Sequence, residues 1–360
     1  MQHPFDPDPE DAVHSRTVHD RKGHPVAVSV RDVAAAAGVS VGTVSNVLNR
    51  PDKVAEDTVE RVRDAIQRLG FVRNDAARQL RAGRSRSIGL IVLDAGNPFF
   101  ADVARGAEAR ADEDRLSVLL GNSDEDAARE SSYLDLFREQ RVNGVLITPA
   151  SDDVTGLQRL ADAGTPVVLV DHEVPGSGFC SVSVDDVEGG YLATRHLLDI
   201  GRRRIAFLAG PSSIAQVAHR LEGARRAVDE VPEAALEVIE ADALSVLNGR
   251  EAGDAILGRA AADRPDAVFA ANDLLAVGLL QALTMLGSVR VPEEIALIGY
   301  DDIDFASATV VPLTSIRQPA RLIGHTAVDL LLRSIDDPDG DYERNVRFRP
   351  ELVVRASTGG

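Results

Sequence analysis

Short apolar runs alternate with amphipathic stretches from Ser87 onward, and this alternation limits the possible fold more than any other feature of the chain. The runs predict buried strands of a parallel sheet, and they read SIGLIVL, LSVLLG, VNGVLIT, PVVLVD, RIAFLAG, ALEVIEA, DAVFAAN and EIALIGYD. Helices are expected between them, at residues 99–114, 127–141, 187–200, 217–231, 246–261 and 274–286. Alternation of this kind is typical of a doubly wound α/β architecture.

The length of this region indicates two subdomains. It spans about 270 residues, which is long for a single doubly wound sheet, so we expect two similar subdomains with a cleft between them. Ligands bind such sheets outside the carboxyl ends of the strands. The residues that directly follow each run are therefore the first candidates for a site.

Cysteine content and the first 25 residues exclude several classes of protein. Cys180 is the single cysteine of 360 residues, so neither an internal disulfide nor a multi-thiolate metal site can form within one chain. Residues 1–25 contain no apolar run that could serve as the core of a signal peptide, and 18 consecutive apolar residues occur nowhere. We expect a cytoplasmic protein that is neither secreted nor anchored in a membrane.

Residues 1–26 are predicted to form a disordered extension. They are rich in Pro, Asp and His, a composition that buries too little apolar surface to order itself. Four of the eight histidines lie in this extension, but their irregular spacing matches no metal-ligand motif. We predict no metal site and no cofactor for the chain.

The net charge of −18 is unevenly distributed along the chain. Residues 26–86 contain 11 Lys and Arg against 7 Asp and Glu, a net charge of +4, whereas residues 87–360 contain 25 against 45, a net charge of −20. This asymmetry is expected when only the front segment approaches nucleic-acid phosphates. A chance bias of the surface is the alternative, which charge alone does not exclude.

Three short helices are predicted before Ser87. Ser29 and Asp32 form a capping box for the first helix, which Gly38 ends, and Ser40 caps the second. A third helix ends at Gly70, and its apolar residues recur at helical spacing: Val59, Val62, Ile66 and Leu69. Four consecutive alanines in the first helix offer the small side chains that closely crossing helices need.

The exposed side of the second helix favours DNA binding over a plain bundle. Its side chains are short, so the helix could lie deep in a groove: Val41, Gly42, Thr43, Ser45 and Asn46. Hydroxyl groups can contact phosphate, and an asparagine can pair bidentately with adenine. A helix-turn-helix with its second helix in the major groove explains these residues best.

The chain resembles the lactose-repressor (LacI/GalR) family of bacterial transcription regulators. The resemblance begins at VRDVAAAAGVSVGTVSNVLN and RLGFVRNDAARQLRAGRSRSIGLIV, and it covers nearly everything after Val28. Later motifs that carry it are GNPFFADVARGAE, RVNGVLITPA, HRLEGA, AANDLLAVGLL, VPEEIALIGYDD, PLTSIRQP and RPELVVRAST. It implies a body like that of periplasmic sugar-binding proteins and a dimer bound to a pseudopalindromic operator in double-stranded DNA.

The resemblance also implies a division of the chain. A helix-turn-helix domain covers residues 27–73, a hinge helix and linker cover 74–86, and the effector-binding and dimerisation core covers 87–360. Within the core, the N-subdomain is expected at about 87–198 and 320–345, and the C-subdomain at about 199–318 and 346–360. The C-terminal sequence contains no leucine heptad, so a dimer is expected.

DNA-contacting residues are carried over from the family to the matching positions. Val41, Gly42 and Asn46 are expected to select bases, although Gly42 has no side chain to read one. Ser40, Thr43, Ser45 and Asn49 are expected to contact the DNA backbone or to stabilise the turn. In the hinge, Ala77 and Leu80 are expected to face the minor groove, where the leucine acts as a wedge between base pairs. Asn74 is also expected to contact DNA, and Arg81 is expected to hold a phosphate. An ordinary linker role is the alternative for Leu80.

Effector-binding residues are implied at one cleft: Phe99, Phe100, Asp185, Gln216, Arg220, Asn272, Asp273, Asp301 and Gln318. Carboxylate, guanidinium and amide groups bind vicinal hydroxyls, and a phenylalanine can lie against the apolar face of a pyranose. Each residue also has a structural alternative, which we favour for Asp273 as a helix cap, whereas Arg220 and Asp301 are expected to bind the ligand. Ile214 and Gln216 do not reproduce the set expected for a purine, so a sugar or sugar derivative is preferred.

Two other classes of function fit the sequence less well than a regulator. An enzyme is disfavoured because the chain has no G-x-S-x-G, H-E-x-x-H or G-x-x-x-x-G-K-[ST] motif. A soluble sugar-binding protein would share the body but would have no use for residues 28–86. A regulator that requires a non-sugar corepressor remains open, as do the effector, the operator and the sign of the response.

Overall fold

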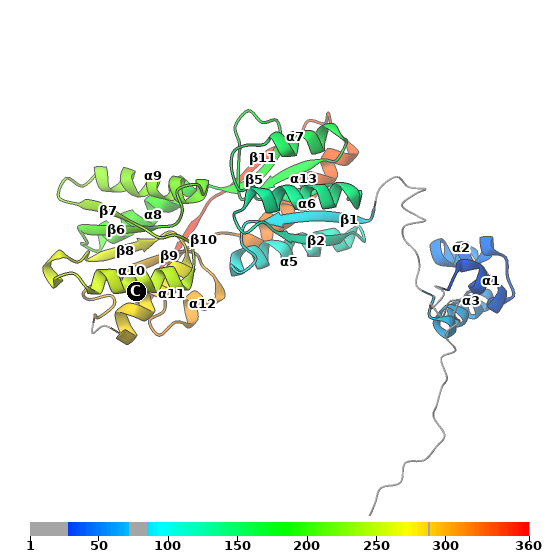
Figure 1. Cartoon of the computed structure of the whole chain (residues 1–360), viewed down its shortest axis with the longest axis horizontal. Helices are drawn as coiled ribbons and strands as arrows, with labels where there is room; N and C mark the ends of the chain where they lie inside the picture. Colours follow the sequence, from blue (N-terminus) through cyan, green and yellow to red (C-terminus); the bar gives the residue numbers. More distant parts are fainter. Residues whose placement is uncertain (1–27, 72–84, 287–288, 360) are drawn as a thin grey trace, which may run out of the picture. The chain divides into compact units, whose positions relative to one another are not determined.

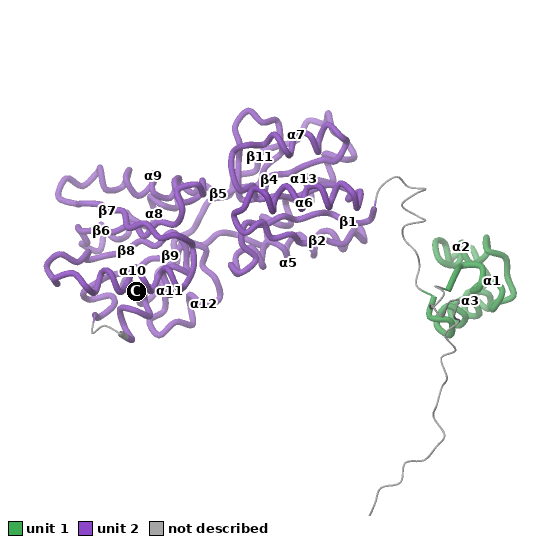
Figure 2. Tube along the Cα trace, viewed as in Figure 1, with its two compact units in different colours: residues 1–82 green, residues 83–360 purple. Residues whose placement is uncertain are grey.

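The computed structural model describes residues 28–71, 85–286 and 289–359 (Figure 1). The chain divides into two compact units, residues 1–82 and residues 83–360, which Figure 2 draws in different colours. The extension expected at residues 1–26 lies outside the described residues, as do the hinge positions Asn74, Ala77, Leu80 and Arg81. The predictions for those residues stay predictions.

The first unit contains the three expected helices, α1 (Val30–Ala37), α2 (Val41–Asn49) and α3 (Glu56–Leu69), with a 3₁₀ turn at Pro51–Lys53. The capping predictions are confirmed: Ser29 and Asp32 form a capping box, and Gly38 ends α1 in the left-handed conformation at φ 66°. Gly70 ends α3 in the same way at φ 61°.

One small apolar core joins the three helices of this unit. It consists of buried residues from each helix: Val33, Ala34, Ala37, Val44, Val47, Val59, Val62 and Ala65. Only two of the four consecutive alanines belong to it, because Ala35 and Ala36 are exposed. The close-packing explanation therefore holds for half of the alanine run, and helix propensity accounts for the rest.

Two six-stranded sheets form the second unit. The first has the order β11-β5-β4-β3-β1-β2 and is parallel throughout. Its strands are β1 (Ser87–Val92), β2 (Ser117–Asn122), β3 (Val145–Ile147), β4 (Val167–Val170), β5 (Cys180–Val184) and β11 (Asn345–Phe348). Helices cover both faces, with α5 (Pro98–Glu113) and α13 (Ala320–Asp336) on one and α6 (Ala127–Glu139) and α7 (Thr155–Asp162) on the other.

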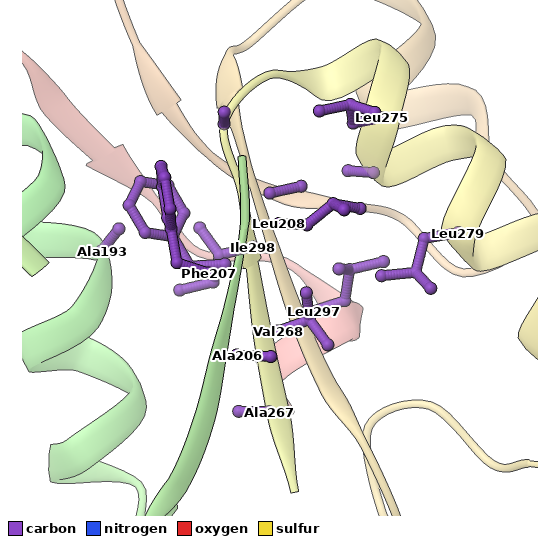
Figure 3. Packing of buried hydrophobic residues seen from close by; sticks show 14 of the residues in the cluster. Ala193, Ala206, Phe207, Leu208, Ala267, Val268, Leu275, Leu279, Leu297 and Ile298 are labelled. Atoms are coloured by element: carbon purple, nitrogen blue, oxygen red, sulfur yellow. The ribbon is translucent and has the colours of Figure 1, made fainter. Parts of the chain in front are cut away.

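The second sheet has the order β12-β10-β9-β8-β6-β7, and only β12 is antiparallel to its neighbour. Its strands are β6 (Arg204–Ala209), β7 (Ala235–Glu240), β8 (Ala267–Ala270), β9 (Ala296–Asp301), β10 (Thr314–Arg317) and β12 (Glu351–Val353). Its helices are α8 (Asp186–Asp199), α9 (Ala215–Asp229), α10 (Val246–Leu257), α11 (Asp273–Gln281) and α12 (Asp304–Ala308). Figure 3 shows Ala193 on one side of this sheet and Leu275 and Leu279 on the other.

The expected subdomain boundaries need correction at two places. Helix α8 packs on the second sheet, because its Ala193 and Leu197 belong to the apolar core there. Strand β11 pairs with β5 of the first sheet, although most of it was assigned to the C-subdomain. The chain therefore crosses between the subdomains three times, after β5, after β10 and after β11.

Paired glycines bring neighbouring helices into backbone contact. At Gly190 of α8, a Cβ atom would lie 2.0 Å from the carbonyl oxygen of Arg220 in α9, and at Gly223 of α9 it would lie 1.9 Å from the carbonyl oxygen of Val187 in α8. Two further pairs behave alike, in α5 with α13 and in α10 with α11: Gly106 with Gly324, and Gly249 with Gly278. Side chains near these crossings are consequently held at fixed positions.

Candidate DNA-binding and effector sites

Helix α2 presents a polar surface opposite its apolar contacts. Ser40 begins the helix, since its Oγ accepts a hydrogen bond from the Thr43 backbone N–H at 3.1 Å and lies 2.9 Å from Thr43 Oγ1. Val41, Gly42 and Asn46 are exposed, with Val41 43% exposed. The residues expected to read bases thus lie on the accessible face of α2.

Ser45 and Asn49 contact each other rather than standing apart. Asn49 Nδ2 donates to the Ser45 backbone oxygen at 2.8 Å and lies 3.3 Å from Ser45 Oγ. This bond spans one helical turn at the carboxyl end of α2. The expectation that these two residues contact the DNA backbone or stabilise the turn stays a prediction.

The positive charge of the front segment is not located on the three helices. Residues 28–71 contain six Lys and Arg and six Asp and Glu, a net charge of zero. Residues 73–86 contain five arginines and one aspartate, which is the whole excess of +4. The net positive charge of the front segment is therefore carried by the stretch of sequence that follows the helix bundle.

A cavity of about 40 Å³ lies between the two sheets of the second unit. Six of the nine residues expected at the effector site line it: Phe99, Phe100, Gln216, Arg220, Asn272 and Asp301. The other lining residues are Leu93, Asp94, Asn97, Glu125, Asp171, Ile214, Val217 and Leu244. Because a water molecule needs about 10–15 Å³ of such volume, the cavity holds about three, and a sugar would require the cleft to widen.

Arg220 is buried and fixed by several partners. Its Nε donates to Asp186 Oδ1 at 2.8 Å, and its Nη1 donates to the Ala271 backbone oxygen at 2.7 Å. Its guanidinium carbon lies 3.6 Å from the centre of the Tyr300 ring, and Nη1 lies 3.9 Å from Asp301 Oδ1. The charge of Arg220 is thus already balanced by the protein.

Asp301 ends β9 and joins the two subdomains. Its Oδ2 accepts from Asn97 Nδ2 at 3.1 Å, although Asn97 caps α5 of the first subdomain. Its Oδ1 accepts from Gln318 Nε2 at 2.8 Å. Asp301 has a φ of 105°, which is unusual for a residue other than glycine. Burial raises the pKa of Asp301, while Arg220 opposes the rise.

A second contact across the cleft involves Gln216 and Asp171. Gln216 Nε2 donates to the Asp171 backbone oxygen at 2.6 Å and lies 3.2 Å from Asp171 Oδ2. Asp171 directly follows β4 and is only 4% exposed. Burial, and next the carboxylate of Asp186, raise the pKa of Asp171 well above its usual value.

Three residues expected at the effector site lie elsewhere. Asp273 does not line the cavity, and Asn272 caps α11 in its place by accepting from the Leu275 N–H at 2.9 Å. Asp273 instead accepts hydrogen bonds from Ser315 Oγ at 2.7 Å and from the Ile303 N–H at 2.9 Å. These two bonds connect the turn that follows β9 with strand β10. The expected helix-capping role of Asp273 is therefore wrong.

The other two residues support the cleft from outside the cavity. Asp185 caps α8 by accepting from the Glu188 N–H at 3.0 Å, and it lines a neighbouring cavity. Gln318 lies behind Asp301 and holds its carboxylate. Asn97 and Asp171 are absent from the residues expected at the effector site, although Asp171 is the last residue of the predicted run PVVLVD and directly follows β4.

Two other kinds of site concern the described residues, 28–71, 85–286 and 289–359. No helix there is long and apolar enough to cross a membrane. No group of three or more His, Cys, Asp or Glu side chains in these ranges is placed to hold a metal ion.

Two family models match the chain. The model of bacterial regulatory proteins of the lacI family matches residues 29–74, and the model of a periplasmic binding protein-like domain matches residues 194–358. The HTH-type transcriptional repressor PurR of Vibrio vulnificus (strain CMCP6) is 36% identical over 334 residues, which are 91% of this chain and 97% of that protein. The regulator DegA of Bacillus subtilis (strain 168) is 32% identical over 335 residues, 92% and 98% of the two chains.

Solved structures agree with these matches. A lac repressor dimer bound to operator and the anti-inducer ONPF is 29% identical, with a TM-score of 0.79, and covers 92% of this chain and 99% of that chain. A complex of the transcriptional regulator CelR with cellobiose is 33% identical, with a TM-score of 0.66 and the same coverage. The expected fold class, helix-turn-helix helices followed by two parallel-sheet subdomains, is confirmed.

Proposed function

We propose how a small molecule controls this chain, which belongs to the lacI family of bacterial regulatory proteins and is a DNA-binding transcriptional repressor rather than an enzyme. The match to relatives over nine-tenths of the sequence carries the family assignment. The cleft between the two sheets supports the control step, because it gathers aromatic, amide and charged side chains around one cavity. We place the protein in the cytoplasm, where operator DNA is accessible.

Base selection in this proposal depends on α2. Asn46 is exposed on α2 and has the donor and acceptor that pair with adenine, whereas Gly42 offers no side chain. Val41, which is exposed on the same helix, would contact a thymine methyl group. The arginines of residues 73–86 would hold phosphates, and Leu80 would act as the minor-groove wedge.

A dimer is supported by one exposed apolar surface in the second subdomain, which we call the α11–α12 surface. It surrounds a groove of about 460 Å³, and its most exposed apolar side chains are Met285 at 76%, Phe305 at 62% and Val310 at 77%. Apolar side chains exposed together in this way mark protein interfaces. A dimer about a two-fold axis would place two copies of α2 on two operator half-sites.

The effector in this proposal is a sugar or sugar derivative bound in the cleft. The contacts of Asn97 with Asp301 and of Gln216 with Asp171 hold the cleft nearly closed, so a ligand of sugar size must rearrange them. Their rearrangement changes the orientation of the two subdomains. A coupling of about 1–3 kcal/mol would alter operator affinity by about 5–150-fold.

The test is an electrophoretic mobility shift of the DNA upstream of the gene with the full-length chain. We expect a salt-sensitive shift that Asn46→Ala weakens by about 1–3 kcal/mol, the range for a bidentate base contact. Gln67→Ala, at an exposed position of α3, is the matched control and should bind as the unaltered chain does. A full-length chain that fails to shift this DNA at low salt would overturn the proposed operator.

A further inference from the structure

The charged side chains that line the effector cavity are mainly acidic. Of its described lining residues four are carboxylates, Asp94, Glu125, Asp171 and Asp301, and the one cation is Arg220. Arg220 is already paired with Asp186 at 2.8 Å. Phosphate or carboxylate groups of a ligand would therefore meet repulsion here without a free cation to bind them.

Asp171 has a carboxylate that its surroundings leave incomplete. Its Oδ1 is buried and has no hydrogen-bond partner among the described residues. Its Oδ2 lies 3.2 Å from Gln216 Nε2, but that amide makes its shorter bond, 2.6 Å, to the backbone oxygen of Asp171. Any residue at this position would offer the same backbone oxygen. A buried polar atom without a hydrogen-bond partner is destabilising, so a ligand that donates to Asp171 Oδ1 would be stabilised there.

A neighbouring cavity extends the acidic surroundings. It has a volume of about 260 Å³ and shares Asp171 and Gln216 with the first cavity. Its own lining adds further carboxylates: Asp152, Glu173, Asp185 and Asp186. Its one arginine, Arg347, is paired with Glu173 at 2.5 Å. Both cavities that meet at Asp171 thus contain more acidic than basic side chains.

Aromatic rings complete the first cavity. Phe99 and Phe100 form an edge-to-face pair with ring centres 5.1 Å apart, and both line the space beside Asp171. An aromatic face attracts a cation as well as the apolar face of a sugar ring. Carboxylates and aromatic rings together suit a protonated amine on a hydroxylated frame.

We propose that the effector is a polyhydroxylated compound with a protonated amine, such as an amino sugar, and that Asp171 binds its ammonium group. The inference rests on the proposed function and names the class of effector for it. The hydroxyl groups of the ligand are received by Asn272 and Asp301, and its ring lies against the phenylalanines. The raised pKa of Asp171 supports this assignment, because a bound ammonium takes the place of the proton that the buried carboxyl otherwise holds.

Matched sugar sets test the charge preference. Each set contains the amine, alcohol, acetylated and acidic forms of one sugar. For glucose these are D-glucosamine, D-glucose, N-acetyl-D-glucosamine and D-glucuronate, and the galactose and mannose sets are built in the same way. Thermal shift and calorimetry on the full-length chain compare the members of each set. The free amine of one set should bind about tenfold to a hundredfold more tightly than its alcohol, acetylated and acidic counterparts. A neutral or acidic compound as the tightest ligand, or no binding by any amine, would overturn the inference. Binding of putrescine as tight as that of the amino sugar would overturn the hydroxylated frame.

Two variants test whether Asp171 is the carboxylate that binds the ammonium group. Asp171→Asn should weaken binding of the amine by about tenfold or more and should abolish the proton release seen by calorimetry in buffers of different ionisation enthalpy. Asn is suited to the φ of 54° at this position, so the fold is retained. Asp135→Asn removes the same charge from a side chain that is 65% exposed, and it should bind normally. Unchanged amine binding by Asp171→Asn would refute the assignment.

Operator binding separates this inference from the proposed function. The mobility shift without any sugar measures the repressor alone. A neutral sugar that alters the shift would leave the proposed function intact and overturn the amine. A chain that binds the amine tightly but never shifts its upstream DNA would overturn the proposed function and leave the amine inference intact.

Discussion

Substitution of Gly190 by alanine should disturb the effector site through the contact of α8 with α9. The new Cβ would lie 2.0 Å from the carbonyl oxygen of Arg220, whereas carbon and oxygen atoms normally approach no closer than about 3.3 Å. The two helices must therefore separate by about 1 Å. Asp186 lies one turn before Gly190 on α8, so its 2.8 Å bond to Arg220 should lengthen beyond hydrogen-bond range.

The expected cost combines two effects. Overpacking of a close contact costs about 1–3 kcal/mol, and breaking a buried ion pair costs up to about 3–5 kcal/mol. Because the helices can share the displacement, we expect a total of about 2–4 kcal/mol. For a unit of this size each kcal/mol lowers the melting temperature by about 2–4 °C, which gives a decrease of about 4–16 °C.

Differential scanning calorimetry measures the loss of stability, and the same measurement with the effector added measures the disturbance of the effector site. Gly156→Ala is the matched control, since the nearest atom to its new Cβ would be Leu134 Cδ1 at an ordinary 3.6 Å. The control should melt at the same temperature as the unaltered chain or higher, because alanine favours a helix. A melting temperature of Gly190→Ala within about 1 °C of the unaltered chain would refute the close-contact reasoning.

Three further outcomes are expected. Burial and Asp186 raise the folded pKa of Asp171 above its unfolded value, so the stability from this group is present in acid and lost as pH rises. Asp171→Asn should therefore raise the melting temperature of the ligand-free chain by about 2–6 °C at about pH 8 and change it little at about pH 4, as calorimetry at both values would show. Ser40→Ala removes a helix cap worth about 1 kcal/mol, and hydrogen exchange of the α2 amides should be about fivefold faster. Met285→Lys should convert a dimer to monomer in sedimentation velocity, and a persistent dimer would place the interface elsewhere.

Strand β5 shows why some elements escape prediction. Its sequence CSVSV places serines between apolar residues, which does not read as a buried run, yet all five residues are buried. The Ser181 hydroxyl can lie inside because its Oγ donates to Asn345 Oδ1 at 3.0 Å. That partner belongs to β11, 164 residues further along the chain. A local pattern contains no information on such a partner, so β5 and β11 were both missed.

The candidate site was predictable where one strand end determines it. Asn272 lies shortly after strand β8 and Asp301 ends strand β9, both of which the sequence predicts, and both residues line the cavity. Asn97 could not be found in this way, because its role depends on a bond to Asp301 across the cleft. The capping role was assigned one residue too late, at Asp273, because Asn and Asp both favour the cap position and only the start of α11 distinguishes them.

The groups that set the charge of the cavity are attached to the segments that join the subdomains. Asp186, which holds Arg220, begins α8 directly after the crossing that follows β5. Gln318, which holds Asp301, lies in the crossing that follows β10. A change in subdomain orientation must therefore move these carboxylates relative to Asp171, which belongs to the first subdomain. An ammonium group between Asp171 and Asp301 would attract both carboxylates, so the same interaction that selects the effector also holds the subdomains in the wider arrangement that the ligand requires.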